Sequence, residues 1–383
     1  MSDSVAVFDR AGFLKRAAAL GLLAQAGPLA LAAEAGADAG RALAYRGVCY
    51  DTGVNFAPGY LSREVWSRRL LEGELDAIRG GLQCNSVNVF GSSLERLMDT
   101  SAAALRRGLH VWLQPRLVDS PQERVLEHLA RAAREAERLR RRYGRVTLNV
   151  GCEYSIFVPG ILPGDSWQER SAALADPGVD FERLARRLNA FVARAAAVAR
   201  SHFRGRVTYA SGAWESIDWT PFDFVGLDYY SYHRQRVGYV KELRGYRDWR
   251  KPIVICEFGS TTHKGAAKKG GDGDAIVDWN KPHPEVLGNP VRSEAEQARH
   301  IVELLDIFES QRIYAASVYA FIEPVAAYSP DPRYDLDMGS FGIVKAIRKD
   351  HENSASPYHW EPKHAFHALA RHNREAARRA MAR

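Results

Sequence analysis

The sequence is poor in the residues and motifs that mark several large protein classes. Its 383 residues include only four cysteines, which lie far apart in or beside apolar runs: Cys49, Cys84, Cys152 and Cys256. This distribution predicts buried, reduced thiols and argues against a disulfide framework. The sequence also has no Cys–His spacing of a zinc site, no Walker loop and no GxGxxG motif after the first predicted strand. These absences argue against zinc modules, P-loop enzymes and dinucleotide-binding domains.

A strong excess of one charge and a long apolar run are also missing. The 53 basic and 46 acidic residues leave a net charge of only +7. Many arginines lie within Arg131–Arg145, interleaved with glutamates at helical spacing, which is typical of a solvated helix face. We therefore expect no nucleic-acid partner. No run beyond residue 42 is apolar over the length that a transmembrane helix needs, so we expect no transmembrane segment.

The N-terminal segment, residues 1–41, differs in composition from the rest. Its stretch Arg10–Lys15 precedes the Ala/Leu-rich run Ala17–Ala33. This arrangement resembles a twin-arginine export signal, except that Ala11 replaces the second arginine and Gln25 and Pro28 weaken the apolar run. Two alternatives stay open: export through a degenerate signal, or a helical leader on a cytoplasmic protein. The predicted catalytic domain then spans 42–383.

After residue 42, short β-rich runs alternate with longer amphipathic runs. The predicted strands are Leu43–Tyr50, Ser86–Phe90, Leu109–Gln114, Val146–Cys152, Arg206–Ser211, Phe224–Tyr230, Ile253–Phe258 and Ala315–Phe321. The predicted helices are Ser62–Arg79, Leu94–Arg107, Gln122–Tyr143, Phe181–Phe203, Val237–Arg247, Glu294–Ser310 and Lys363–Ala380. This alternation predicts an α/β fold, a single-domain (β/α)8 TIM barrel rather than an open doubly wound sheet. Long loops are expected after strands four, seven and eight.

Side-chain alternation within the strands indicates which residues face the barrel axis. In the fourth strand Val146, Leu148 and Val150 share one face, and Glu153 belongs to the other. In the seventh strand Glu257 lies opposite the apolar set. Because the helix-facing side of a barrel strand must be apolar, the polar set is expected to point toward the axis. Polar residues at the carboxyl ends of strands then belong to an open, hydrated mouth, where such barrels place their active sites.

Glu153 and Glu257 end the fourth and seventh predicted strands at the same level of the barrel. Glycoside hydrolysis needs such a pair of carboxyl groups. One protonates the departing oxygen and the other meets the oxocarbenium-like carbon. Their environments must raise the pKa of the acid and lower that of the nucleophile. The pair therefore favours a carbohydrate-cleaving enzyme over a structural salt-bridge role.

Three segments resemble the clan-A glycoside hydrolases, a superfamily of retaining barrel enzymes: Val150–Glu153, Phe222–Tyr230 and Pro252–Gly259. The resemblance implies that Glu153 is the acid/base, that Glu257 is the nucleophile, and that the configuration is retained through a glycosyl-enzyme intermediate. It also implies that Tyr230 hydrogen-bonds the nucleophile. It further implies a carbohydrate or glycoside substrate and no cofactor.

One position departs from the superfamily pattern. The residue before the acid/base glutamate is usually an asparagine that contacts the sugar 2-hydroxyl, whereas here it is Cys152, a poor hydrogen-bond partner. The departure is compatible with an unusual sugar, a different reaction or lost catalysis. Two classes of function therefore stay open: a glycoside hydrolase or transglycosylase, and a catalytically silent barrel that binds a sugar or a protein partner.

Further candidate substrate-binding residues are expected at the mouth, in addition to Cys152 and Tyr230. They are Asp51, Asn88, Gln114, Arg116, Trp214, Asp228, Tyr319 and Glu323. The aromatic members are candidate platforms for a sugar face, with core packing as the alternative. For Arg116 and Asp51 the alternative is a structural ion pair. No strand carries the paired inward histidines of a metal-dependent barrel hydrolase, so no catalytic metal is expected.

Overall fold

The computed structural model describes residues 43–381, so the predicted leader at 1–41 lies outside the described part of the chain. Eight parallel strands form the central sheet, in the order β7-β6-β5-β4-β1-β12-β9-β8. They are β1 (Tyr45–Asp51), β4 (Ser86–Gly91), β5 (His110–Pro115), β6 (Val146–Cys152), β7 (Val207–Ala210), β8 (Val225–Asp228), β9 (Ile253–Phe258) and β12 (Ala315–Val318). The Ser211–Leu227 bridge joins β7 to β8. Two backbone hydrogen bonds of Ser211 with Gly226 (3.0 Å) and Asp228 (2.9 Å) complete the closure. The predicted TIM barrel is confirmed.

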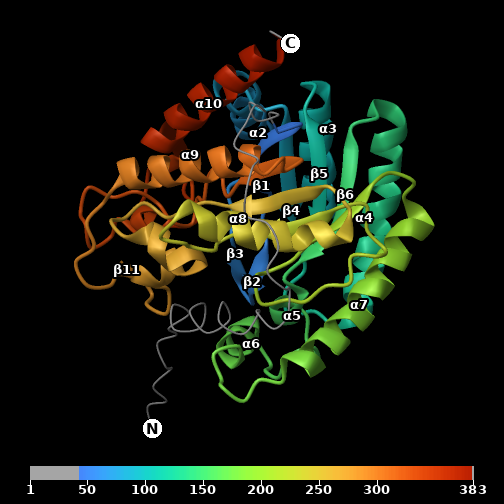
Figure 1. The fold of residues 1–383 in the computed structure, drawn as a ribbon. Coiled ribbons are helices and arrows are strands. Elements are labelled where there is room, and N and C mark those ends of the chain that lie inside the picture. The colour runs from blue at the N-terminus through green and yellow to red at the C-terminus, as the bar shows by residue number, and fades with distance from the viewer. Residues whose placement is uncertain (1–42, 382–383) are drawn as a thin grey trace.

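Helices cover the outside of the barrel (Figure 1). They are α2 (Arg68–Asp76), α3 (Leu94–Arg106), α4 (Gln122–Tyr143), α7 (Phe181–His202), α8 (Arg236–Gly245), α9 (Glu294–Ser310) and α10 (His364–Met381). All seven predicted helices are present, and α10 packs along α9. The prediction was wrong at the start of the first helix, because Ser67 caps α2 and Ser62 instead accepts a hydrogen bond from Val54 N at 2.7 Å. No helix within residues 43–381 is long and apolar enough to cross a bilayer.

The strand ends also differ from the prediction. The eighth barrel strand stops at Val318, three residues before the predicted end, because Ala320 N bonds the Phe341 carbonyl of a later loop (3.2 Å). The connection from β7 to β8 contains no helix among the described residues. Instead, the rings of Trp219 and Phe222 lie 6.5 and 6.4 Å from that of Tyr209 and fill the outer face there. Apolar burial by aromatic side chains thus replaces a crossover helix.

The long loops expected after strands four, seven and eight are present and contain secondary structure of their own. They hold α5 (Tyr154–Phe157) and α6 (Trp167–Ala173), then η3 (Ala266–Ile276), β10 (Val277–Asp278) and β11 (Glu285–Val286), and then η4 (Leu336–Gly339), β13 (Val344–Arg348) and β14 (Tyr358–Pro362). A short hairpin of β2 (Asn55–Ala57) and β3 (Tyr60–Leu61) follows β1. Figure 1 shows α5, α6 and this hairpin toward the same end of the molecule, away from the C-terminus. These insertions build up the carboxyl-end face of the barrel.

All four cysteines are buried and unpaired, as predicted. Cys49 Sγ donates to the Cys256 carbonyl across the barrel at 3.2 Å. Asn88 Nδ2 donates to the same carbonyl, also at 3.2 Å. A backbone carbonyl of β9 thereby accepts from side chains of β1 and β4 inside the barrel.

A buried ion network ties the C-terminal segment to the loop after β12. Lys363 Nζ lies 2.8 Å from Asp337 Oδ1, with side-chain exposures of 0% and 1%. Arg292 reaches Asp337 Oδ2 (2.7 Å) and Asp335 Oδ2 (2.9 Å). Burial is the largest influence on Lys363 and lowers its pKa, while the Asp337 charge opposes that shift. Lys363 and Arg292 therefore offset the cost of burying the charges of Asp337 and Asp335, and the two carboxylates do the same for the two cations.

We expect Lys363→Met to destabilise the protein by about 3–5 kcal/mol, because it removes one of the two cations that offset the buried charge of Asp337 and leaves its Oδ1 without an ion-pair partner. The measurement is urea unfolding followed by circular dichroism. The matched control is Lys281→Met, since Lys281 pairs with Glu285 at 2.7 Å but is 45% exposed. An exposed pair is worth less than about 1 kcal/mol. Equal losses in the two variants would contradict a special role for the buried network.

Candidate active site

Glu257 lies near the carboxyl end of β9 and is held from two sides. Its Oε1 lies 2.5 Å from Arg116 Nη2, in an ion pair whose side chains are only 5% and 9% exposed. Its Oε2 accepts a hydrogen bond from Tyr230 Oη at 3.3 Å. The hydrogen bond between the tyrosine after the sixth barrel strand and this carboxylate is the one that the family resemblance implies. Both oxygens of Glu257 are therefore oriented at the mouth of the barrel.

Arg116 is itself fixed by its neighbours. Its Nε and Nη2 donate to Gln114 Oε1 at 3.1 and 2.5 Å. Its guanidinium carbon lies 4.2 Å from the centre of the Phe90 ring, and that ring stacks on Tyr319 at 5.8 Å. Hydrogen bonds in the guanidinium plane and a ring on its face leave the side chain little freedom. Tyr319, predicted as a sugar platform, contributes in this way to packing around Arg116.

Glu153 follows β6 and starts the short helix α5. Its φ of +41° puts it in the left-handed region, an uncommon conformation for a non-glycine residue. Its backbone N–H donates to the Ala210 carbonyl (3.0 Å), and its own carbonyl accepts from Ile156 N (3.0 Å) and Phe157 N (3.1 Å). These bonds over-determine the backbone and support the strained turn. The side chain is half-buried at the rim, less enclosed than Glu257.

Asp228, Cys152 and Glu257 meet at the floor of the mouth. One Asp228 oxygen, the Cys152 sulfur and one Glu257 oxygen lie within 4.8 Å of one another. Simple alternation put Cys152 on the helix-facing side, but the β6–β7 register shifts between Asn149 and Cys152. The β8–β9 register likewise shifts just before Asp228, which pairs with Glu257. Such bulges change the direction of side chains, and here they lie beside Cys152 and Asp228, whose side chains meet near Glu257.

Asp228 is the most strongly perturbed carboxyl of this cluster. Burial raises its pKa well above the ordinary value, and the charges of Glu257 and then Glu153 raise it further, while Arg116 lowers it. Neither carboxyl oxygen of Asp228 has a hydrogen-bond partner among residues 43–381. Burial also raises the Cys152 pKa well above normal, with Arg116 opposing. Burial therefore favours the protonated forms of the Asp228 carboxyl and of the Cys152 thiol beside Glu257.

The same three groups are the candidate metal ligands among the described residues. The donor set of one thiol and two carboxylates is chemically mixed. However, the guanidinium of Arg116 already occupies Oε1 of Glu257. A cation at this point would be repelled by that guanidinium, and a thiolate ligand would require deprotonating a thiol whose pKa is raised. The arrangement therefore fits an ion pair with Arg116 better than a metal centre.

Glu215 supports the Glu153 turn and was missed from the sequence. Its Oε1 accepts from Ser155 N (3.0 Å) and Ser155 Oγ (2.6 Å), and its Oε2 accepts from Tyr209 Oη (2.8 Å) and Gly212 N (3.2 Å). Trp214 Nε1 donates to Ser155 Oγ at 2.9 Å, which places this predicted platform beside the same network. Glu215 lies in an irregular loop, where strand alternation carries no signal. Only its contacts identify it.

The remaining predicted residues lie at different depths. Asn88 is 1% exposed and donates into the barrel interior, below the glutamates. Asp51 is also buried, and its Oδ1 accepts from Gly53 N at 2.7 Å. Glu323 Oε2 accepts from Phe341 N at 2.6 Å. Burial first, and then the charges of Glu323 and Asp51, raise the pKa of Tyr60.

Burial raises the pKa of Glu323 to about 7 from an ordinary 4.5, despite hydrogen bonds from Ser340 and Phe341 that lower it. An acid of this kind keeps its proton in the folded state over an interval in which the unfolded chain releases it. The contribution of Glu323 to the stability of the fold is therefore complete below its pKa in the unfolded chain. This contribution is lost as the pH rises through its pKa in the folded protein, which is about 7. The loss amounts to at most about 3 kcal/mol.

We expect Glu323→Gln to flatten the fall in stability between pH 4.5 and pH 7, because the amide keeps an acceptor for Phe341 N without titrating. Urea unfolding at pH 5 and pH 8 measures the difference between the variant and the wild type. Glu352→Gln, at an exposed position, serves as the control. If the two variants show the same pH dependence, Glu323 does not titrate in this interval.

Comparisons with known proteins give a likeness of structure only. No protein-family model matches the sequence, and no match was found among curated proteins. Similar solved structures include a complex of a GH113 β-1,4-mannanase, with 13% identity, a TM-score of 0.56, and coverage of 87% of this chain and 99% of the mannanase. A GH113 β-mannanase from Alicyclobacillus acidocaldarius has 15% identity and a TM-score of 0.53, covering 87% of this chain and 98% of its own.

A β-glucosidase mutant derived from a hyperthermophilic tetrameric structure is also similar, at 9% identity and a TM-score of 0.51, covering 87% of this chain and 95% of its own. At such identities the likeness establishes the fold and leaves activity and substrate to other evidence. The fold that the family resemblance implies is confirmed: the chain has a (β/α)8 barrel like that of these glycoside hydrolases.

Proposed function

We propose that the protein is a glycoside hydrolase that acts by a retaining double displacement, with Glu153 as acid/base and Glu257 as nucleophile. The observation that carries the proposal is that both glutamates lie at the carboxyl end of the barrel: Glu257 near the end of β9, held by Arg116 and Tyr230, and Glu153 directly after β6. The charges of both also raise the pKa of the same buried residue, Asp228, which agrees with this placement. Double displacement needs two carboxyl groups that face one glycosidic bond.

Glu257 suits the role of nucleophile because its position is restrained. The ion pair with Arg116 and the hydrogen bond from Tyr230 hold its two oxygens in different directions. In the first step a Glu257 oxygen bonds to the anomeric carbon as the bond to the leaving oxygen breaks. Charge then leaves the carboxylate, so its bonds with Arg116 and Tyr230 weaken on forming the ester and strengthen when the ester is hydrolysed.

Glu153 suits the role of acid/base because it lies at the half-buried rim. In the first step it donates its proton to the departing glycosidic oxygen. In the second step it removes a proton from the water that attacks the anomeric carbon, which releases Glu257 and restores the starting state. The Glu215 network holds the turn after Glu153 through Ser155 and Tyr209, which supports the geometry that both steps need.

Asp228 is proposed to form the hydrogen bond to the sugar that Cys152 cannot form. The thiol is a weak hydrogen-bond partner, whereas the Asp228 carboxyl, within 4.8 Å of it, has two oxygens without a partner among residues 43–381. A buried polar group without a partner is costly, so a bound hydroxyl group would offset that cost. The carboxyl is proposed to bind the sugar hydroxyl next to the reacting carbon, donating its proton or accepting one.

A catalytically silent, sugar-binding barrel is the second candidate. The observation that favours it is the position of Cys152 beside Glu257, where a weak hydrogen-bonding group replaces a strong one at the reacting centre. Transglycosylation shares the glycosyl-enzyme intermediate and differs only in the acceptor, a sugar instead of water. Measured turnover separates the silent barrel from both reactions, and product analysis separates hydrolysis from transfer.

We expect Glu257→Gln and Glu153→Gln each to lower kcat on activated aryl glycosides or mannan- and glucan-type oligosaccharides, by roughly 10³-fold or more for Glu257. Glu153→Gln should lose less on substrates whose leaving group needs no proton. Glu352→Gln, at an exposed position, is the control with the same change of side chain. The absence of wild-type turnover on all sugars, with saccharide binding intact, would favour the silent barrel.

Product stereochemistry tests the mechanism directly. Proton NMR of the first-formed sugar should show the substrate's anomeric configuration, because two inversions give net retention. Azide added to Glu257→Gly should restore turnover and give a glycosyl azide of inverted configuration. An inverted sugar from the wild type would instead require a single displacement, and the assigned roles would fail.

The part of Asp228 is tested by a pair of substitutions. Asp228→Asn removes the titrating group and keeps the shape, and should lower kcat/KM by about tenfold or more if a sugar hydroxyl binds there. Cys152→Asn should recover part of that loss in the double variant, because an amide at position 152 can bind the same hydroxyl. Additive effects of the two substitutions would contradict a shared contact.

A further inference from the structure

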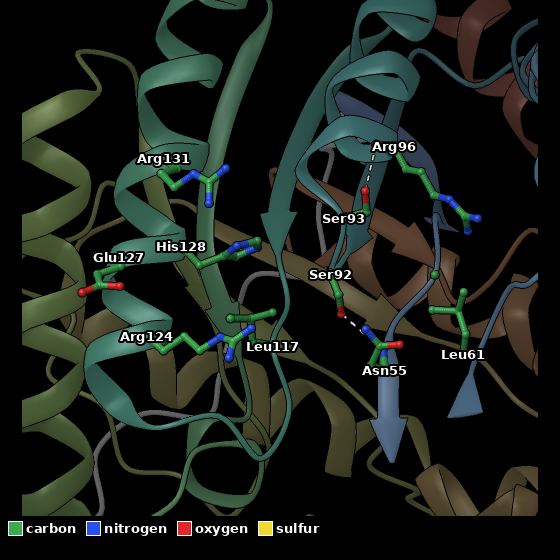
Figure 2. A pocket seen from close by; sticks show the side chains of 11 residues that line it. Asn55, Leu61, Ser92, Ser93, Arg96, Leu117, Arg124, Glu127, His128 and Arg131 are labelled. Atoms are coloured by element: carbon green, nitrogen blue, oxygen red, sulfur yellow. Dashed lines mark hydrogen bonds between the residues drawn. The ribbon is translucent and has the colours of Figure 1, made fainter. Parts of the chain in front are cut away.

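A second cleft lies beside the candidate active site, between α4 and the loops that follow β1 and β4. Its volume is about 490 Å³, within the range of small-molecule sites. One wall is the first half of α4, and the other contains Asn55, Ser92 and Ser93 (Figure 2). We call this the α4 cleft. It contains neither Glu153 nor Glu257.

Four residues of helix α4 line the α4 cleft: Arg124, Glu127, His128 and Arg131. Figure 2 shows the side chains of Arg124, His128 and Arg131 pointing from α4 toward the opposite wall, whereas Glu127 points away. The side chain of neither arginine forms an ion pair or a hydrogen bond with any residue of 43–381. Two guanidinium groups therefore line the cleft without a bonded counter-charge.

His128 lies between these arginines and responds to them. Burial, and then the charges of Arg131 and Arg124, lower its pKa to about 4. Its Nε2 is buried and has no hydrogen-bond partner in the described part of the chain. The neutral imidazole therefore has a buried nitrogen that a ligand in the cleft could satisfy.

The opposite wall also offers hydrogen-bond donors. Ser93 caps α3, and its Oγ accepts from Arg96 N at 3.4 Å, which leaves its own proton to donate. The start of this 13-residue helix adds a positive dipole end. By contrast, Arg96 is used structurally, since its Nη1 donates to the carbonyls of Thr52 (3.2 Å) and Arg63 (2.8 Å). The ligand-facing cations are thus those of α4.

We propose that the α4 cleft binds a small ligand that carries a phosphate or sulfate ester. Two unpaired guanidinium groups, the hydroxyl of Ser93 and a helix start together match the charge and the several acceptor oxygens of such a group. The remaining volume accommodates the sugar or other body of the ligand. The proposal is independent of the catalytic roles of Glu153 and Glu257.

The test is isothermal titration calorimetry on the full chain with three probes: inorganic phosphate, glucose 6-phosphate and a sulfated disaccharide. Glucose serves as the uncharged control. At least one ester should bind, more tightly than glucose and more weakly as salt rises. The double variant Arg124→Gln/Arg131→Gln should lower that affinity by about tenfold or more. A tighter affinity for glucose 6-phosphate or for the sulfated disaccharide shows whether the ligand carries a phosphate ester or a sulfate ester.

The matched control is Arg183→Gln/Arg187→Gln. These two arginines of α7 are also exposed and helical, and their side chains form no ion pair within residues 43–381. The control removes the same net charge and should change affinity less than twofold. Equal weakening in both double variants would show a general charge effect and overturn the proposal, as would failure of both esters to bind wild type. Thermal unfolding of each variant, which should match that of wild type, excludes loss of folding as the cause.

Discussion

The buried ion pair of Arg116 and Glu257 is the interaction on which the candidate site depends. Taking both charges out of water is costly, and their attraction offsets that cost only with good geometry and further hydrogen bonds. Gln114, Tyr230 and the Phe90 ring supply these contacts. Without the guanidinium, the negative charge of Glu257 would lie beside the buried carboxyl of Asp228 in a region with little solvent. The ion pair therefore allows these two carboxyl groups to lie close together.

The barrel contributes more than a rigid frame. Its strands bring Glu257 and Glu153 to the same end, but the final positions of Cys152 and Asp228 depend on register shifts where neighbouring strands part. Bulges at the rim turn side chains that regular alternation would direct elsewhere. The left-handed turn at Glu153 has a similar effect, and the buried Glu215 stabilises it by accepting four hydrogen bonds. Local departures from regular structure thus position the chemistry.

The candidate active site and the α4 cleft share structural elements although their side chains differ. Ser92 lines the cleft, and its Oγ donates to the Arg116 carbonyl at 2.8 Å. Gly53 lines the cleft two residues after Asp51 and donates to that carboxylate. A ligand in the cleft would therefore contact the loops that hold Arg116 and Asp51. Binding there and chemistry at the mouth are physically adjacent, which gives a route for one to influence the other.

The sequence by itself determined the barrel, its helices, the burial of its cysteines and the ends of the strands from which Glu153 and Glu257 project. Those features follow from apolar periodicity, which acts along the chain and is visible in it. Only the tertiary structure showed the register shift beside Cys152, the support that Glu215 gives to the Glu153 turn, and the two arginines of α4 that line a cleft without bonded partners. Each of these depends on contacts between segments distant in the chain, where a bulge, an irregular loop or a neighbouring helix leaves no periodic signal.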